Sequence, residues 1–351
     1  MTNKSSATKK GFGSKSKNMS DTNMLLTITI VIFFVMYIGA ILFLGEGFLK
    51  PQTFLSILSS NAALIITSCG MSIVMITGGI DISVGGVVAL VSMCSAVYLD
   101  KQNGSVGGAI LISLAIGLAF GIVQGFLVAY LDIQPFIVSL AGMFFARGMT
   151  TIVNNKPFNV ENKAFVALKD TRVIVPGLGS VNRLGKYIDA YVEIGVVVAL
   201  LVVLALFIIL RWTKLGRGFY AVGGNAQSAL MLGINVKRTK FISHVLCSLL
   251  AGIGGFVYFM HVGSGSPSHA MGMEMNAIAS SIIGGTMLTG GVGNIIGTLF
   301  GVLSLSTIQN IVASAGFDEA WLTGITIAVM LCLFLVIQSV VMAKKKKTVQ
   351  S

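Results

Sequence analysis

The sequence predicts an all-α protein that crosses a membrane many times, and three observations lead to that class. Hydrophobic residues make up 55% of the 351 residues and charged residues only 10%. The mean hydropathy is +0.90, which excludes an ordinary soluble domain. Apolar runs long enough to cross a bilayer recur along the whole chain. Every proline falls between these runs, as expected where a missing N–H donor would break a helix: Pro51, Pro135, Pro157, Pro176 and Pro267.

About ten membrane helices are expected, arranged as two pseudo-repeats. The eighth segment is short and runs directly into a glycine-rich break. An even number of crossings places both ends of the chain on the same side. The expected spans are residues 24–44, 53–76, 84–99, 107–130, 136–153, 190–210, 241–260, 275–283, 294–312 and 319–338.

The distribution of lysine and arginine predicts which side that is. Lysines precede the first span and follow the last, so both termini are expected in the cytoplasm. We divide the chain into a disordered basic tail over 1–20, a membrane domain over 21–343 and a second basic tail over 344–351. The net charge of +12 is explained by this topology and by contact with lipid. No folded basic module is visible, so a nucleic-acid partner is not expected.

The loop over residues 154–187 lies outside the cell by this count of spans. It carries six basic residues and two acidic ones, so it offers a basic face to an acidic protein partner. The alternative is a solvated loop that packs over the helix ends. The basic residues are Lys156, Lys163, Lys169, Arg172, Arg183 and Lys186, against Glu161 and Asp170.

A polar island over residues 211–240 interrupts the apolar pattern with six basic residues and no acid, which places it on the cytoplasmic side. Asn225 is a good helix N-cap, and the spacing predicts a short helix over 226–232 that ends at Gly233. The glycines Gly216, Gly218, Gly223 and Gly224 are expected to form tight turns before it. Such a helix suits the groove of a partner protein, whereas the alternative is an ordinary connector.

Glycine-rich interruptions recur in the two halves of the chain: TGGIDISVGG at 77–86 and IGGTMLTGGVG at 283–293. Irregular backbone is tolerated inside a membrane only where it is buried or lines water, so paired interruptions predict a substrate path between the two repeats. The alternative is close helix packing, which we assign to the ridges at Gly117, Gly121 and Gly125 and at Gly293, Gly297 and Gly301. The expected hinge glycines are Gly78, Gly79, Gly85, Gly86, Gly284, Gly285, Gly290 and Gly291.

Asp81 lies in the first interruption, where a carboxylate caps the following helix, touches substrate or pairs with a cation. The polar groups inside the spans are mostly amides and hydroxyls, which suits a neutral, polyhydroxylated ligand. The cysteines and histidines show no metal-binding spacing, so no metal site is expected. The residues that we expect along the path are Asn61, Asp81, Ser83, Gln124, Asn276 and Thr286.

Three motifs in order resemble those of the permease subunits of bacterial ABC sugar importers of the ribose, galactose and xylose type. They are GGIDISVGG at 78–86, GRGFYAVGGNAQSALMLGI at 216–234 and MEMNAIASSIIGGTMLTGGVGNIIGTLFGVL at 273–303. The last is most similar to the galactofuranose-type branch. The resemblance covers roughly residues 50–340 and is specific to the family more than to the substrate.

The resemblance implies a permease in the cytoplasmic membrane that moves a monosaccharide by alternating access. The implied partners are an ABC ATPase, a second permease subunit, either a paralogue or a second copy, and a sugar-binding protein. The chain has no GxxxxGK[ST] phosphate loop, so ATP and Mg²⁺ are expected on the ATPase and no cofactor on this chain. The island resembles the family's coupling helix, and its implied ATPase contacts are Arg217, Gly218, Ala221, Gly224, Asn225, Ala229, Leu232 and Gly233.

Two alternatives stay open at this stage. A permease for a nucleoside or a branched-chain amino acid would share the same pattern, because related permeases differ mainly in the lining of the path. An ion-coupled secondary transporter would need acidic coupling sites, and the spans offer few candidates beyond Asp81, Glu193 and Glu274.

Overall fold

The computed structural model describes residues 21–181, 187–314 and 320–350, so the predicted tail over 1–20 lies outside the described residues. Helices dominate the fold, as predicted: α1 (Asp21–Leu44), α2 (Glu46–Leu49), α3 (Pro51–Ile76), α4 (Val84–Asp100), α5 (Val106–Ala129), α6 (Pro135–Val153), α7 (Lys163–Lys169), α8 (Ile194–Trp212), α9 (Lys214–Gly224), α10 (Ala226–Met231), α11 (Val236–Val262), α12 (Met273–Ile283), α13 (Ile295–Ser314) and α14 (Ala320–Gln350). The strands are β1 (Phe158–Asn159), β2 (Arg172–Val181), β3 (Tyr187–Glu193) and β4 (Ser264–Gly265).

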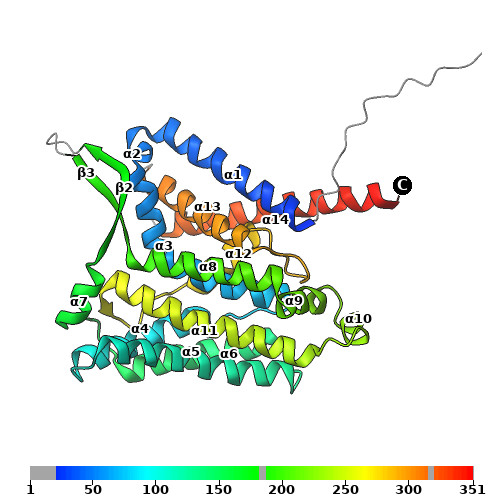
Figure 1. Cartoon of the computed structure of the whole chain (residues 1–351), viewed down its shortest axis with the longest axis horizontal. Coiled ribbons are helices and arrows are strands. Elements are labelled where there is room, and N and C mark those ends of the chain that lie inside the picture. The colour runs from blue at the N-terminus through cyan, green and yellow to red at the C-terminus, as the bar shows by residue number, and fades with distance from the viewer. Residues whose placement is uncertain (1–20, 182–186, 315–319, 351) are drawn as a thin grey trace, which may run out of the picture.

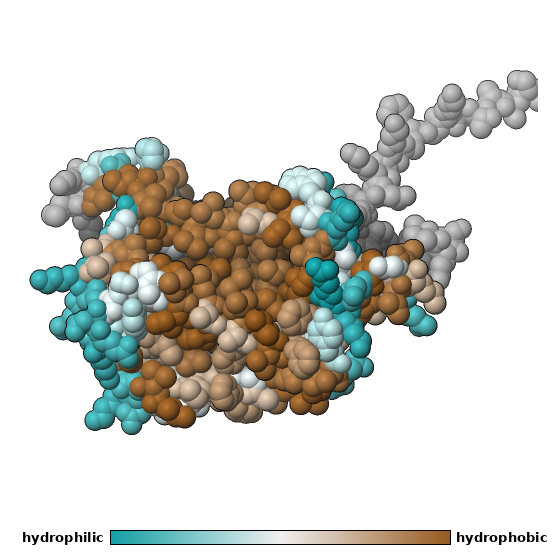
Figure 2. Space-filling view, turned by 60° about the horizontal axis from the view of Figure 1, so that its bottom comes forward, coloured by the Kyte–Doolittle hydropathy of each residue, from teal (hydrophilic) through white to brown (hydrophobic). Residues whose placement is uncertain are grey.

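The long helices lie side by side and form a broad apolar belt between two polar ends (Figures 1 and 2). Seven of the described helices are long and apolar enough to cross a bilayer. The end that carries α9 and α10 is called the α10 end below, and the end that carries α2, α7 and the β2–β3 hairpin is called the hairpin end (Figure 1). The belt and its two polar ends are the expected form of a multi-pass membrane protein.

The order and contacts of the helices reveal two inverted repeats, α3–α6 and α11–α14. Helix α3 runs toward the α10 end and α11 runs away from it, and the two long helices pack against each other at the centre. Helix α11 also packs on α4 and α5 of the first repeat, while α3 packs on α12 and α13 of the second. The long helix of each repeat therefore buries its apolar surface against helices of the other repeat.

Glycine ridges explain how closely these helices approach. The predicted ridge on α5 is confirmed, and so are Gly297 and Gly301 of the second ridge, whereas Gly293 precedes α13 and faces the side chain of Ile76. A side chain at Gly117, Gly121 or Gly125 of α5 would meet the backbone of α11 within 3.0 Å. Gly297 and Gly301 of α13 lie in the same way against the carbonyl oxygens of Gly284 and Ser280. Inside a membrane the hydrophobic effect does not drive helices together, because lipid is as apolar as the helix surface. Glycine, which has no Cβ atom, lets two helix backbones pack closely and so favours their association.

The hairpin end contains β-structure that the sequence did not predict. Strands β2 and β3 pair antiparallel, and β1 pairs with β4. The amide of Gln52 accepts a hydrogen bond from Tyr191 N and donates one to Tyr191 O, which fixes β3 over the start of α3. The sixth span begins at Ile194 rather than at residue 190 because Glu193 is the last residue of this strand. Predicted basic residues are engaged here: Lys169 pairs with Asp170 at 2.9 Å, and Arg172 lies over the ring of Tyr191.

Candidate functional site

Two helices inside the bundle are shorter than the seven candidate spans, and their N-termini meet. Helix α12 has 11 residues and α4 has 17, which correspond to about 16 Å and about 25 Å. A Cβ atom at Gly85 would lie 3.1 Å from Glu274 N and would overlap the Glu274 carboxylate. The two helices therefore begin side by side, and their partial positive charges face the same region. Each start carries one buried acid, Asp81 or Glu274, and a carboxylate stabilises a helix N-terminus.

The first broken segment, residues 77–83, is organised around the Asp81 side chain. Asp81 is fully buried, and its Oδ1 accepts hydrogen bonds from Ser83 N at 3.0 Å and from Ser83 Oγ at 2.6 Å. Gln124 Nε2 of α5 donates to Ser83 Oγ at 2.8 Å, and Ser248 Oγ of α11 donates to Asp81 Oδ2 at 3.4 Å. This geometry agrees with the predicted capping role of Asp81. It also brings together three of the predicted path residues, Asp81, Ser83 and Gln124.

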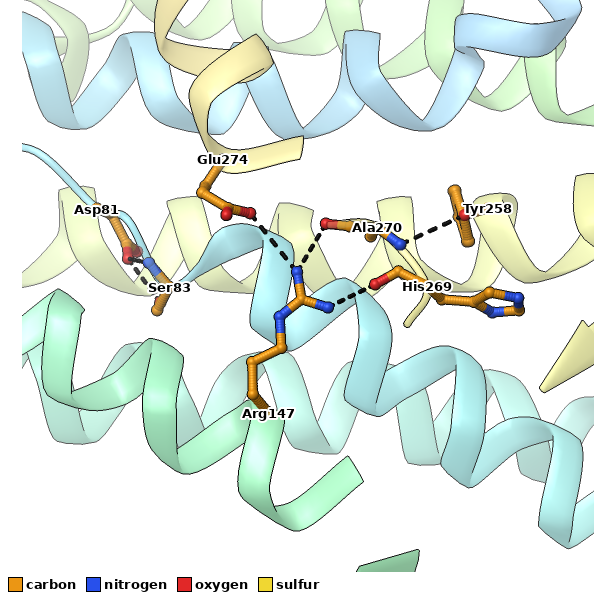
Figure 3. Close-up of polar contacts among 7 residues, drawn as sticks. All are labelled: Asp81, Ser83, Arg147, Tyr258, His269, Ala270 and Glu274. Carbon is orange, nitrogen blue, oxygen red and sulfur yellow. Dashed lines mark hydrogen bonds and ion pairs between the residues drawn. The ribbon is translucent and has the colours of Figure 1, made fainter. Parts of the chain in front are cut away.

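The second broken segment, residues 263–272, is fastened by an arginine of the other repeat (Figure 3). Arg147 of α6 donates to the carbonyl oxygens of His269 at 2.5 Å and Ala270 at 2.7 Å. Its Nη2 also lies 3.7 Å from Glu274 Oε2, and both side chains are largely buried. The sequence predicts no role for Arg147 and offers Glu274 only as a candidate coupling site of a secondary transporter. The available signal was a single arginine in an apolar run, which is rare inside a membrane unless the charge has a role.

The order of the helices shows that the two glycine-rich motifs do not occupy equivalent positions in the two repeats. The sequence comparison matched the 77–86 motif with the 283–293 motif. In the structure the segment between α3 and α4 corresponds to residues 263–272 between α11 and α12, whereas 284–294 connects α12 to α13. The internal glycine similarity therefore reflects two sites of close backbone approach and not two symmetry-related breaks.

Those two glycine motifs meet each other and the polar island at the α10 end. Gly291 N donates to Ile76 O at 2.9 Å, which joins the end of α3 to the loop after α12. Gly223 of α9 lies against the same Ile76 carbonyl, and a Cβ atom there would overlap it. A Cβ atom at Gly290 would lie 3.0 Å from Gly78 Cα and 2.8 Å from Gly223 O. We call this contact of Gly78, Gly223, Gly290 and Gly291 the glycine junction.

A tyrosine reinforces the junction from α9. Tyr220 OH donates to Gly293 O at 2.9 Å. Burial raises the pKa of Tyr220 to about 12, so the hydroxyl keeps its proton and remains a donor at every physiological pH.

The eight predicted hinge glycines fall into two groups. Gly78, Gly285, Gly290 and Gly291 have φ between +75° and +89°, a conformation that favours glycine. The others, Gly79, Gly85, Gly86 and Gly284, allow close contact with neighbouring side chains or backbone. The remaining predicted path residues stand apart from the Asp81 network: Asn61 bonds to its own helix, Asn276 is half-buried, and Thr286 is buried with no hydrogen-bond partner for its hydroxyl in the described part of the chain.

The polar island forms two helices instead of the one expected. The short helix is confirmed as α10: the Asn225 side chain accepts from Ser228 N, and Gly233 follows with φ +81°. The predicted glycine turns before it were wrong, because Gly216, Gly218, Gly223 and Gly224 are part of helix α9. Glycine serves close packing there, since a Cβ atom at Gly216 would overlap the backbone of α8.

Only some of the implied ATPase contacts can reach a partner. Gly218 and Ala229 are buried and Ala221 is half-buried, whereas Arg217, Gly224, Asn225, Leu232 and Gly233 are exposed. The structure adds two neighbours that the sequence analysis missed, Leu230 and Met231. With Leu232 they are 63%, 79% and 79% exposed on the polar α10 end. We call these three residues the α10 apolar tip, and apolar side chains at such a place mark a protein contact.

Comparison with known proteins agrees with this geometry. The family model described as "Branched-chain amino acid transport system / permease component" matches residues 53–335. The inner membrane ABC transporter permease protein YjfF of Escherichia coli K12 is 36% identical, covering 91% of this chain and 93% of its own. The fructose import permease protein FruG of Bifidobacterium longum is 33% identical over 97% of this chain and 96% of its own.

The ribose import permease protein RbsC of Escherichia coli K12 is 34% identical over 76% of this chain and 79% of its own. No solved structure matches the chain. The family model and the relatives thus cover the two repeats, both broken segments and α9–α10 together. The chain belongs to this family of multi-pass transport permeases, the membrane subunits of ABC transporters.

Proposed function

We propose that the chain is the permease subunit of an ABC importer and moves a monosaccharide across the cytoplasmic membrane by alternating access. The glycine junction carries this proposal. It joins α9, which precedes the α10 apolar tip, to the end of α3 and to the loop after α12 through backbone contacts. A force on α10 therefore acts on both repeats at once, as rocking one repeat against the other requires.

The sugar class is supported by relatives that bear fructose and ribose import in their names. The family model's own description mentions branched-chain amino acids, so a permease for that cargo is the second candidate. Most of the buried polar side chains of the membrane helices carry hydroxyl groups and few are charged, which suits a neutral ligand rich in hydroxyl groups.

The partners follow from the two ends of the molecule. An ATPase at the α10 end would cover the α10 apolar tip, and ATP and Mg²⁺ would bind to that partner. A sugar-binding protein would contact the hairpin end. Under this proposal both termini would lie in the cytoplasm. A second permease subunit, a paralogue or another copy, would pack on α6, whose exposed face carries large apolar side chains, among them Phe136, Phe144 and Phe145.

Uptake by vesicles tests the proposal. The chain is reconstituted with an ABC ATPase and a sugar-binding protein from the same organism, and labelled pentoses, hexoses, leucine and a nucleoside are supplied with and without ATP. ATP-dependent accumulation of one sugar is the expected result. Accumulation of leucine or the nucleoside would select the second candidate, and uptake that follows an ion gradient without ATP would overturn the importer assignment.

A docking variant tests the ATPase surface. Gly224 is exposed and a Cβ atom there meets nothing within 4 Å, so Gly224→Arg adds bulk toward a partner without an internal clash. We expect normal membrane insertion and loss of sugar-stimulated ATP hydrolysis, while Gly224→Ala behaves as the parent. Ala229 is buried, so Ala229→Glu is expected to disturb α10 itself as well as docking. Full uptake by Gly224→Arg would refute the docking assignment.

A further inference from the structure

We infer that Arg147 is a positioning residue of the transport path: it fixes the second broken segment and the start of α12 through a fork of two hydrogen bonds to backbone carbonyls. This inference deepens the proposed function, since it assigns a role in alternating access to a residue that has none so far. It starts from a charged side chain that a membrane helix retains only at a cost.

The geometry shows what Arg147 holds. Nη1 donates to His269 O and Nη2 to Ala270 O, and both carbonyls belong to the irregular backbone that leads into α12. Ala270 has φ +52°, which is unfavourable for a residue with a side chain and persists only where neighbouring contacts enforce it. The planar guanidinium suits this task because its donors point in fixed, diverging directions, which an ammonium group cannot reproduce.

Further contacts hold the same segment less tightly. Ser92 Oγ of α4 is 3.1 Å from His269 Nδ1. Tyr258 OH accepts a hydrogen bond from Ala270 N at 3.4 Å (Figure 3). The Arg147 bonds are the shortest contacts that the described residues make with this segment, and they come from the opposite repeat. Residues 269 and 270 are therefore located chiefly by α6, whereas Ser264 and Gly265 at the start of the segment pair with β1.

The Glu274 contact is the weaker half of the arrangement. Its Nη2–Oε2 separation of 3.7 Å is too long for a hydrogen bond, and Oε2 has no hydrogen-bond partner among the described residues. Glu274 compensates the positive charge of Arg147 and the partial positive charge at the start of α12, while the two hydrogen bonds to carbonyl oxygens fix the position of the segment. Variants of Glu274 and Arg147 can therefore separate the effect of charge from the effect of hydrogen-bond geometry.

Hydrogen exchange measured on the whole chain in lipid nanodiscs, followed on peptides within residues 263–276, tests the inference without reference to any cargo. Arg147→Gln is expected to speed exchange there by about tenfold or more, because breaking a buried arginine contact exposes the segment to opening. Arg147→Lys keeps the charge but not the fork, and should resemble Arg147→Gln. Glu274→Gln keeps the fork and should change exchange less. Arg211→Gln, at the exposed end of α8, is the matched control and should leave the exchange of these peptides unchanged.

Parent-like exchange in Arg147→Gln would overturn the inference. So would a reversed order, with Glu274→Gln opening the segment and Arg147→Lys leaving it closed, because that order makes charge pairing the cause. Peptides from α9 and α10 report whether Arg147→Gln has unfolded the chain. If these peptides also exchange faster, the comparison of Arg147→Lys with Glu274→Gln tests the inference instead, because Arg147→Lys should open the segment more than Glu274→Gln.

Vesicle uptake then separates this inference from the proposed function. Variants without the fork should saturate at the same binding-protein concentration as the parent but at a lower maximal rate. A parent that moves no sugar with ATP would refute the importer and leave the exchange result standing. A change in the saturating concentration with an unchanged maximal rate would refute the positioning role alone.

Discussion

The two broken segments perform the same geometric task by different means. Residues 77–83 are fixed by a side chain of their own, since Asp81 accepts the hydrogen bonds of Ser83 and connects to Gln124. In residues 263–272, the carbonyl oxygens of His269 and Ala270 instead accept hydrogen bonds from Arg147 of the opposite repeat. The shortest side-chain hydrogen bonds of the first segment thus lie within the segment, with a longer bond from Ser248 of the other repeat. The shortest side-chain hydrogen bonds of the second segment come from the other repeat. A relative movement of the repeats would change the second segment first.

Gly223→Ala should have the largest effect, because it breaks the junction that joins both repeats to α9. The added methyl would overlap Ile76 O and lie 2.6 Å from Gly291 N, and backbone atoms cannot yield as a flexible side chain does. Overpacking of this kind costs about 1–3 kcal/mol or more. We expect ATP-driven uptake to be lost. Gly224→Ala, one residue on and free of contacts, is the matched control in the same uptake assay. Equal uptake by the two variants would argue against the junction.

Asp81→Ala should follow, and it tests whether the first segment is self-contained. The change leaves Ser83 N and Ser83 Oγ buried without their acceptor, at about 1–3 kcal/mol for each stranded group. Asp81→Asn retains an oxygen acceptor and should destabilise less. Thermal unfolding in detergent measures both variants. If the two melt alike and near the parent, the Asp81 network does not organise the segment.

Gly85→Ala should have a moderate effect that depends on Glu274, because the new methyl meets the end of that side chain. Glu274→Ala should relieve part of the damage, with a coupling energy of about 0.5 kcal/mol or more in a double-mutant cycle. Gly86→Ala faces α6 instead, near Met143 O at 3.1 Å, so Glu274→Ala should not relieve it. Strictly additive effects at Gly85 and Glu274 would show that the two helix starts do not press on each other.

Asn225→Ala should have the smallest effect and leave both broken segments intact. It removes the N-cap of α10, at about 1 kcal/mol of local helix stability. We expect a few-fold loss of sugar-stimulated ATP hydrolysis and unchanged melting of the membrane domain. Asn225→Asp keeps the cap acceptor and should be close to the parent. A large drop in melting temperature for Asn225→Ala would mean that α10 supports the bundle as well as the docking surface.

The sequence predicted the structural features that depend on residues close to one another in the chain. The cap at Asn225 and the left-handed Gly233 that bound α10 follow from residues within one turn of each other. The ridge of Gly117, Gly121 and Gly125 is a matter of spacing on one helix face, and the structure confirms it against α11. The capping geometry of Asp81 likewise depends on a residue two positions away.

The sequence by itself determined the all-α membrane class and the place of the polar island, because apolar length and charge placement reflect the contrast between lipid and water. Only the tertiary structure decided which segments are symmetry partners, that glycines expected in turns are helical, and that the β2–β3 hairpin pairs over α3. Arg147 shows the physical reason most clearly: its partners lie 122 and 123 residues away and are backbone carbonyls, which every residue possesses, so no pattern of side chains could indicate them.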